Sequence, residues 1–370
     1  MTTIDDYVES YLAERTGAPI DIDRLNETPS GLAHSDIPEV LLDKRVEERG
    51  LEVMADFMHP ENSVYFDAIY GPQHGQKNIR GWLIPVMQEI SFIKFEPTAE
   101  PVFLDDGMGG TSVDEWIMVA EMGDQRLPLS RGISVRWFRD GWITHAADYY
   151  DTNTFRMPGA MAAAPPPDPN ADAPAPIPDW PREGVPEYDG PVTFPAISAE
   201  AEAWIASRVS GPKSEPSGLS SADIHALIHS PVYGEDFDLQ CDLMHPTESI
   251  YIDPIFGDFK GQADIRAWLT DIMGKLGNIR FKPMGPLVID GDVSVQEWEQ
   301  MAVQPDGTEV FMTRGASVRK VTDGWITYSA DYFDAAPMME ESIQAAGIAA
   351  GSKITAEDIM KYRGSTLGAA

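Results

Sequence analysis

Cysteine is almost absent from this chain, which has a single one, Cys241, among its 370 residues. One thiol excludes an intrachain disulfide framework and a zinc site built from cysteine ligands. A lone cysteine beside Leu239 and Leu243 is typical of a small hydrophobic residue in a core. We therefore expect Cys241 to be structural rather than reactive.

Positive charge is also scarce, with 27 Lys and Arg against 60 Asp and Glu and a net charge of -33 at pH 7. A surface this acidic repels nucleic-acid phosphates and anionic lipid headgroups, so we expect no nucleic-acid partner and no membrane partner. No stretch approaches the roughly 20 apolar residues of a membrane span. The first residues lack the basic and apolar pattern of a signal peptide. The sequence thus predicts a cytoplasmic protein.

What the chain does contain is an internal repeat. The matching segments keep their order and nearly their spacing, which indicates duplication of one domain. In residue numbers they are 11–19 with 204–212, 29–32 with 216–219, 58–60 with 244–246, 63–71 with 249–257, 75–83 with 261–269, 115–116 with 297–298, 131–136 with 314–319, and 140–151 with 323–334.

A segment rich in proline and alanine separates the two copies and cannot form a helix interior or a central strand. We expect a first domain over residues 1–157, a linker over 158–195, a second domain over 196–337 and a helical tail over 338–370. The tail is expected to pack on one copy or on a neighbouring subunit, so a homo-oligomer stays open.

Each copy places helices before strands. In the first copy, Ser35 and Asp36 resemble an N-cap before helical periodicity over residues 37–57. A strand at 63–67 and a helix over 76–90, kinked at Pro85, come next. Strands are expected at 112–120, 127–138 and 142–150, the last two joined by an Asp-Gly turn. The sequence predicts an α+β fold: two tandem cone-shaped barrels, each a curved antiparallel sheet wrapped around helices.

Two stretches carry a family resemblance: VYFDAIYGPQHGQKNIRGWL (64–83) and VRWFRDGWITHAADYYD (135–151), with their echoes in the second copy. They resemble the nuclear-transport-factor-2-like superfamily, which includes SnoaL-like cyclases, ketosteroid isomerase, scytalone dehydratase and limonene epoxide hydrolase. The last of these is especially similar over both stretches. The resemblance implies the cone fold, but it leaves the reaction open because this fold hosts many reactions.

The resemblance also implies which side chains face the cavity. In the epoxide hydrolases, the positions matching Tyr65 and Asp67 hold the attacking water, and the position matching Asp148 faces the cavity. Those enzymes have an arginine and an aspartate where this chain has Trp116 and Met118. The second copy has Trp and Gln there, so we expect neither copy to hydrolyse epoxides by that route.

Strand alternation extends this cavity lining. It predicts Tyr150 on the same face as Asp148, and it predicts Arg131 and Ile133 on the cavity face of the preceding strand. Trp116, Met118, Ile133 and Tyr150 are the expected substrate-binding residues. Such apolar and aromatic lining suits a bulky aromatic or terpenoid ligand.

Arg131, matched by Arg314, is the first candidate for catalysis, because an arginine keeps its proton and is costly to bury unpaired. It would bind a phenolate, an oxyanion or a carboxylate. The alternative is a structural ion pair with Asp148, or with Asp331 in the second copy.

The other candidates are acids and bases. Asp67 and Asp148 are candidate bases, and hydrogen-bonded structural roles are the alternative. Tyr65 and His74 are candidate proton donors, the alternatives being a strand aromatic and a solvated loop residue. The matching candidates of the second copy are Tyr251, Asp253, Lys260 and Asp331. No cluster of His, Asp and Glu has metal-ligand spacing, so we expect no metal and no cofactor.

A tandem fusion of this length resembles the cofactorless diarylpropane lyases, or γ-formaldehyde lyases, of lignin-degrading sphingomonads. The resemblance implies a phenolic diaryl-propanediol substrate that loses water and formaldehyde through a quinone methide, giving a stilbene. Two alternatives stay open. One is a dehydratase or isomerase of a phenolic or polyketide substrate, and the other is a non-catalytic small-molecule carrier or scaffold. We place the reaction in the first copy.

Overall fold

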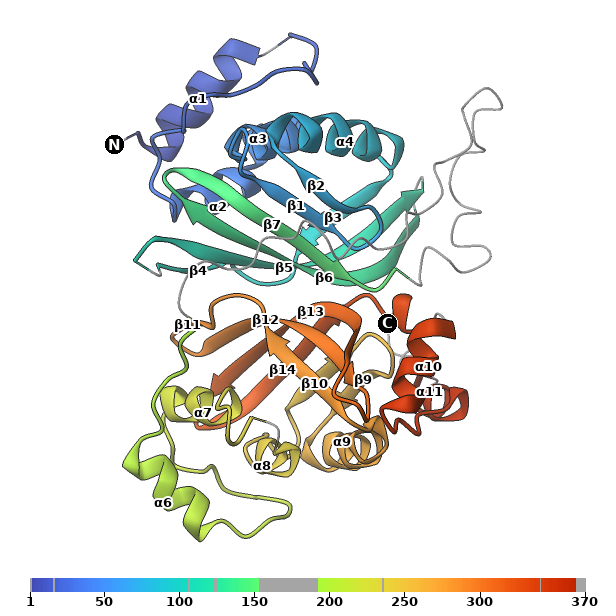
Figure 1. Ribbon diagram of the computed structural model, residues 1–370. Coiled ribbons are helices and arrows are strands. Elements are labelled where there is room, and N and C mark those ends of the chain that lie inside the picture. Colours follow the sequence, from blue (N-terminus) through green and yellow to red (C-terminus); the bar gives the residue numbers. More distant parts are fainter. Residues whose placement is uncertain are drawn as a thin grey trace. The chain divides into compact units, whose positions relative to one another are not determined.

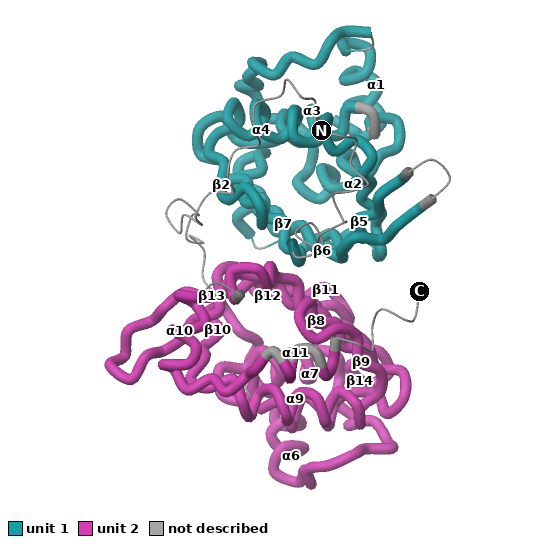
Figure 2. The backbone as a smooth tube through the Cα atoms, turned by 90° about the vertical axis from the view of Figure 1, so that its right-hand side faces the viewer, with its two compact units in different colours: residues 1–187 teal, residues 188–370 magenta. Residues whose placement is uncertain are grey.

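The computed structural model describes residues 2–15, 17–105, 107–122, 125–152, 192–234, 236–339 and 341–363. The chain divides into two compact units, residues 1–187 and 188–370 (Figure 2). Residues 153–191, which include most of the expected linker over 158–195, lie outside the described residues. Each unit pairs one seven-stranded sheet with helices, which confirms the predicted α+β class.

The first unit follows the predicted order of helices and then strands (Figure 1). Its helices are α1 (Ile4–Arg15), α2 (Asp36–Leu42), the 3-10 helix η1 (Lys44–Arg49), α3 (Gly50–Phe57) and α4 (Gln76–Glu89). Its strands are β1 (Val64–Asp67), β2 (Gly71–His74), β3 (Ile93–Pro97), β4 (Val102–Leu104), β5 (Gly109–Met122), β6 (Gln125–Arg139) and β7 (Trp142–Tyr150).

The second unit repeats this arrangement and adds helices at its end. Its helices are α6 (Ala199–Ser207), α7 (Ser221–Ile228), α8 (Phe237–Asp242), α9 (Gln262–Leu276), η3 (Pro337–Met339), α10 (Glu341–Ala349) and α11 (Ala356–Arg363). Its strands are β8 (Ile250–Asp253), β9 (Gly257–Lys260), β10 (Ile279–Pro283), β11 (Val288–Asp290), β12 (Val293–Val303), β13 (Glu309–Thr322) and β14 (Trp325–Phe333).

The sheets are mixed rather than antiparallel, which corrects the prediction. The first sheet has the order β2-β1-β7-β6-β5-β3, with β4 also paired to β5. Its strand pairs are antiparallel except for β1–β7, which is parallel and sets Asp67 beside Asp148. The second sheet has the same exception in the β8–β14 pair. The long connection between β1 and β7, which runs through α4 and the strands β2 to β6, makes a parallel pair possible.

Helices cover one face of each sheet, which we call the inner face (Figure 1). In the first unit, apolar residues of the helices such as Val53, Phe57 and Ile79 pack against Phe138 and Ile143 of the sheet. The second unit has an equivalent core, which includes Cys241. That cysteine is buried and free, as expected of a core residue.

Two local predictions need correction. The expected helix over residues 37–57 is broken at Asp43, where the backbone is extended, and η1 follows. Ser35 makes no side-chain hydrogen bond that caps α2, because its own backbone is already helical. The Asp-Gly turn is confirmed, since Asp140 has φ 51° and Gly141 has φ 83°, as a type I′ hairpin requires.

Candidate functional site

A chain of hydrogen bonds crosses the inner face of the first sheet. Tyr65 Oη donates to Asp148 Oδ2 over 2.5 Å, and Ser134 Oγ donates to Asp148 Oδ1 over 2.6 Å. Trp116 Nε1 in turn donates to Ser134 Oγ over 2.9 Å. The four residues come from β1, β5, β6 and β7, so the register of the whole sheet positions the Asp148 carboxyl group.

The second unit repeats this chain. Tyr251 Oη and Ser317 Oγ donate to the two oxygens of Asp331 over 2.5 and 2.6 Å. Trp298 Nε1 donates to Ser317 Oγ over 2.8 Å. We call each set of four a tetrad: Tyr65, Trp116, Ser134 and Asp148 form the first, and Tyr251, Trp298, Ser317 and Asp331 form the second.

Burial sets the proton affinity of the first tetrad. It raises the pKa of Asp148, against the lowering effects of the hydrogen bonds from Ser134 and Tyr65 and of the nearby Arg136 charge. Burial and the Asp148 carboxylate raise the pKa of Tyr65 well above its usual value. The tyrosine therefore stays protonated at neutral pH and donates its proton to Asp148 in a hydrogen bond.

Asp67 is a buried carboxyl group, adjacent to the half-buried Asp148 across the parallel pair of strands. Its Oδ1 accepts hydrogen bonds from the backbone of Ile69 and Tyr70, and Tyr150 Oη donates to its Oδ2 over 3.1 Å. Burial and the neighbouring Asp148 raise the pKa of Asp67 to about 6. Asp253 makes the same backbone contacts in the second unit. Asp67 thus has a structural role, because it caps the turn after β1, and it also lies next to the Asp148 carboxyl group.

Arg131 does not face the tetrad, contrary to the sequence prediction. It is exposed on the outer face of β6, and Ile133 is buried on that same face. Ser134 and Arg136 occupy the inner face instead. Arg314 is the counterpart of Arg131 in the second copy. It forms an ion pair with Glu299 on the neighbouring strand at 2.5 Å, and not the ion pair with Asp331 that was the alternative expectation.

A β-bulge causes this reversal. Phe138 pairs with Ile143 next to the turn, but Trp137 pairs with His145, so Thr144 is left without a cross-strand partner. This extra residue shifts the register by one and brings Ser134, rather than Ile133, opposite Asp148. The second unit has the same shift at Thr327.

Arg136 is the functional candidate that the sequence prediction missed. It forms a short ion pair with Asp114 on the inner face, and its charge acts on both Asp148 and Tyr65. The Arg136 side chain is 13% exposed. Its match in the second copy is Arg319, within the repeated segments 131–136 and 314–319. The repeat and knowledge of the β-bulge would together have identified Arg136 from the sequence.

The predicted substrate-binding residues Trp116, Met118 and Tyr150 do come together. They form one apolar cluster with Ala68 and Ile93 beside the tetrad, and the rings of Trp116 and Tyr150 lie 5.8 Å apart. This cluster places buried aromatic side chains next to the Asp148 carboxyl group.

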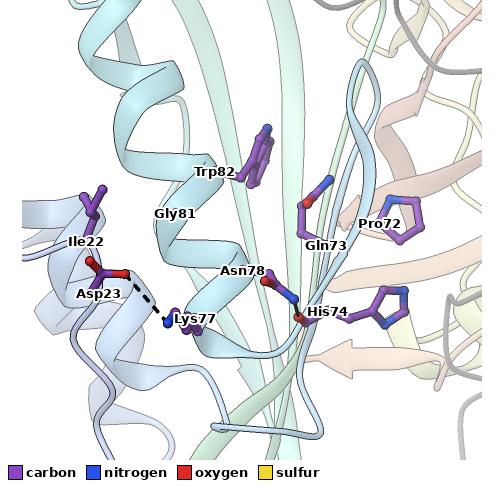
Figure 3. Close-up of a pocket in the computed structure, with 9 residues that line it drawn as sticks. All are labelled: Ile22, Asp23, Pro72, Gln73, His74, Lys77, Asn78, Gly81 and Trp82. Carbon is purple, nitrogen blue, oxygen red and sulfur yellow. Dashed lines mark hydrogen bonds and ion pairs between the residues drawn. The ribbon is translucent and has the colours of Figure 1, made fainter.

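His74 and Lys260 stand apart from the tetrads. Both are exposed at the ends of the short strands β2 and β9. His74 lines an open surface pocket of about 520 Å³, and its ring points away from α4 (Figure 3). The other lining residues are Ile22, Asp23, Pro72, Gln73, Lys77, Asn78, Gly81 and Trp82. Trp82 links this pocket to the tetrad, because its ring contacts that of Tyr65 edge-on at 5.4 Å.

Among the described residues, no three His, Cys, Asp or Glu side chains are grouped so that they could hold a metal ion. None of the helices in the described part of the chain is both long enough and apolar enough to cross a membrane.

Comparison with known proteins finds a family match in the second copy. No curated protein matches the chain. Among solved structures, TerC co-crystallized with polyporic acid is 18% identical, covering 33% of this chain and 95% of that one with a TM-score of 0.27. A putative SnoaL-like polyketide cyclase from Jannaschia sp. CCS1 is 12% identical, covering 36% and 93% with a TM-score of 0.28. The family model of the SnoaL-like domain matches residues 233–329, so the second copy is similar to a SnoaL-like domain.

Proposed function

We propose that the protein is an enzyme that moves protons on a small aromatic substrate without a cofactor. The observation that carries this proposal is the Asp148 carboxyl group of the first tetrad. It is half-buried, has a raised pKa and is fixed by Tyr65 and Ser134 next to buried aromatic side chains. A carboxyl group with a raised pKa keeps its proton to higher pH than an ordinary aspartate, so it can donate a proton and then take one back.

More specifically, we propose a lyase that acts on a phenolic diaryl-propanediol. In the first step Asp148 protonates the benzylic hydroxyl, which leaves as water, while the phenol loses its proton to solvent and the ring becomes a quinone methide. In the second step the Asp148 carboxylate takes the proton from the terminal hydroxymethyl group. The carbon–carbon bond breaks, formaldehyde leaves, and the electron pair returns to the ring, which regains its proton.

The products balance the substrate: one diol gives one stilbene, one water and one formaldehyde, with no net oxidation or reduction. The phenol ring is the electron sink, and Asp148 ends in the protonated form in which it began. Tyr65 and Ser134 hold the carboxyl group in place, and Arg136, rather than Arg131, is the cation beside it.

A panel of phenolic diaryl-propanediols, incubated with the protein in buffer without added cofactor, tests this proposal. We expect stilbene, measured by its absorbance, and formaldehyde to appear in equal molar amounts. Loss of water without formaldehyde would contradict the lyase and indicate a dehydratase. Binding of the diols without any product would indicate a carrier.

A further inference from the structure

The two tetrads are alike, but their arginines have different partners. In the first unit Arg136 forms its ion pair with Asp114. In the second unit Arg319 Nη2 donates to Asp331 Oδ1 over 3.0 Å and to Tyr251 Oη over 3.4 Å. The same cation thus pairs with a neighbouring carboxylate in one copy and with the tetrad itself in the other.

One substitution between the copies accounts for this difference. Gln296 of the second copy stands where the first has Asp114, two residues before the tetrad tryptophan. The Gln296 amide donates to the backbone oxygen of Gly285 over 3.1 Å and carries no charge to hold Arg319. Arg319 instead neutralises Asp331, and its other contacts, with the backbone oxygens of Val318 and Ala330 at 3.0 Å, fix it there.

The charge state of the carboxyl group decides what it can do. An arginine in direct contact favours the ionised form of an aspartate and opposes its protonation. Asp331 thus accepts a hydrogen bond from a cation in addition to those from Tyr251 and Ser317, which leaves its carboxyl group fully engaged. Asp148 has no arginine within hydrogen-bonding distance among the described residues, and burial raises its pKa. It fits the role of an acid.

A second observation, independent of the charges, separates the copies. In the second unit the tail helix α11 packs over the aromatic neighbours of the tetrad. Tyr362 contacts the ring of Phe259 at 5.7 Å, and Phe259 stacks on Trp268 at 4.2 Å. Trp268 in turn contacts Tyr251 of the second tetrad.

Ion pairs hold this tail helix in place. Lys275 of α9 lies 2.6 Å from Asp358, and Lys361 lies 3.0 Å from Asp271 of α9. Tyr362 Oη also donates to Asp271 over 2.8 Å. In the first unit, Gln73 stands in place of Phe259, and the surface over Trp82 is the open pocket of Figure 3.

We infer that the first copy performs the reaction and that the second is a closed copy, and that Asp114 is the positioning residue that makes this difference. By pairing with Arg136, Asp114 keeps the guanidinium group away from the Asp148 carboxyl group. The inference rests on the proposed function, since it assigns the reaction to one of two similar sites.

The variant Asp114→Gln tests the positioning role, because it gives the first copy the residue of the second. Arg136 then turns to Asp148, and the pKa of Asp148 falls. We expect kcat to drop at least 10-fold with little change in KM. The acid form of Asp148 is also lost at lower pH, so the alkaline limb of the kcat profile moves to lower pH. The conservative variant Asp114→Glu is expected to restore both. An unmoved limb in Asp114→Gln would overturn the role of Asp114.

A matched pair of variants tests the choice of copy. We expect Asp148→Asn to lower turnover more than 100-fold. Asp331→Asn, outside the catalytic machinery by this inference, is expected to keep more than half of it. The opposite ranking would overturn the assignment to the first copy and leave the lyase proposal standing.

A substrate-free measurement separates the inference from the proposed function. Carboxyl carbon NMR of the protein, labelled at aspartate, follows the titration of Asp148 in the wild type and in Asp114→Gln. We expect a lower pKa of Asp148 in the variant even if no diol is turned over. An identical titration in both proteins would overturn the positioning of Arg136 by Asp114.

Discussion

Gly132 provides the space in which the tryptophan of the first tetrad sits. It lies directly opposite Trp116 in the β5–β6 pair, and a Cβ at this position would overlap the Trp116 ring. Gly315 faces Trp298 in the same way, with a Cβ placed 2.8 Å from the ring. The absence of a side chain at this position lets each indole reach the serine of its tetrad.

The variant Gly132→Ala tests this close approach. The added methyl group would displace the Trp116 ring and weaken its hydrogen bond to Ser134, at a cost of about 1–3 kcal/mol for overpacking. Chemical denaturation measures the change. Gly81→Ala is the matched control, because a Cβ there meets nothing within 4 Å and alanine favours the α4 helix. Equal stability of Gly132→Ala and wild type would contradict the role of this glycine.

Asp67 gives a pH dependence with a definite sign. Its pKa is about 6 in the folded protein against an unfolded value near 3.8. The unfolded chain therefore loses this proton first as the pH rises. The contribution of Asp67 to stability falls between about pH 4 and 6 and is lowest above pH 6.

Thermal unfolding of wild type and Asp67→Asn across this range measures the effect. The asparagine does not ionise and has no such loss. We therefore expect the difference in Tm, variant minus wild type, to increase from pH 4 to pH 7. A constant difference in Tm across that range would show that the pKa of Asp67 is not raised by burial.

Thr144 shows why the sequence predicted the wrong face for Arg131. A two-residue Asp-Gly turn, continued without interruption, places Ile133 opposite Asp148 and Arg131 on the same face. The bulge at Thr144 adds one residue and brings Ser134 and Arg136 to that face. Nothing in the local composition marks a bulge, because Thr is an ordinary strand residue.

At the scale of elements, a buried ion cluster joins α1, α3 and α4. Arg80 of α4 is fully buried and forms a short ion pair with Asp56 of α3, and Arg15 of α1 lies 3.4 Å from Asp56. The second unit keeps this arrangement, with Arg266 and Arg208 on Asp242. These charges lock the helices that cover the inner face of each sheet.

The variant Asp56→Ala tests the cluster. It removes the nearer of the two carboxylates that Arg80 and Arg15 share and leaves Glu52, at 4.0 and 3.7 Å from them. Breaking a buried pair costs up to about 3–5 kcal/mol. Guanidinium denaturation should show the unit containing Asp56 unfolding at lower concentration. Asp43→Ala is the control, because its pair with Arg45 is at the surface. A loss no larger than that of the control would contradict a structural role for the cluster.

The elements themselves were predictable where a pattern was long. The helix at α4 and the strands β5, β6 and β7 follow the sequence prediction closely. The short strands β2, β3 and β4 were missed, because three to five residues such as Gly71–His74 give too few positions for an alternating pattern. The mixed sheet was missed because parallel pairing of β1 with β7 depends on the whole fold.

At the scale of the whole molecule, the duplication preserved the scaffold and changed the charges. Both copies keep the tetrad, the helix ion cluster and the bulge. They differ at Asp114 and Gln296, and within the described residues a tail helix covers the aromatic residues of the second copy but not those of the first. We interpret this as one copy kept for catalysis and one kept for structure.

The measurement that tests this central claim most directly is formaldehyde release from a phenolic diaryl-propanediol by wild type and by Asp148→Asn. The asparagine can still accept the hydrogen bond of Tyr65, but it can neither donate the first proton nor take the second. We predict that turnover falls more than 100-fold while the Tm stays close to that of wild type. Formaldehyde release at the wild-type rate by folded Asp148→Asn would contradict the account.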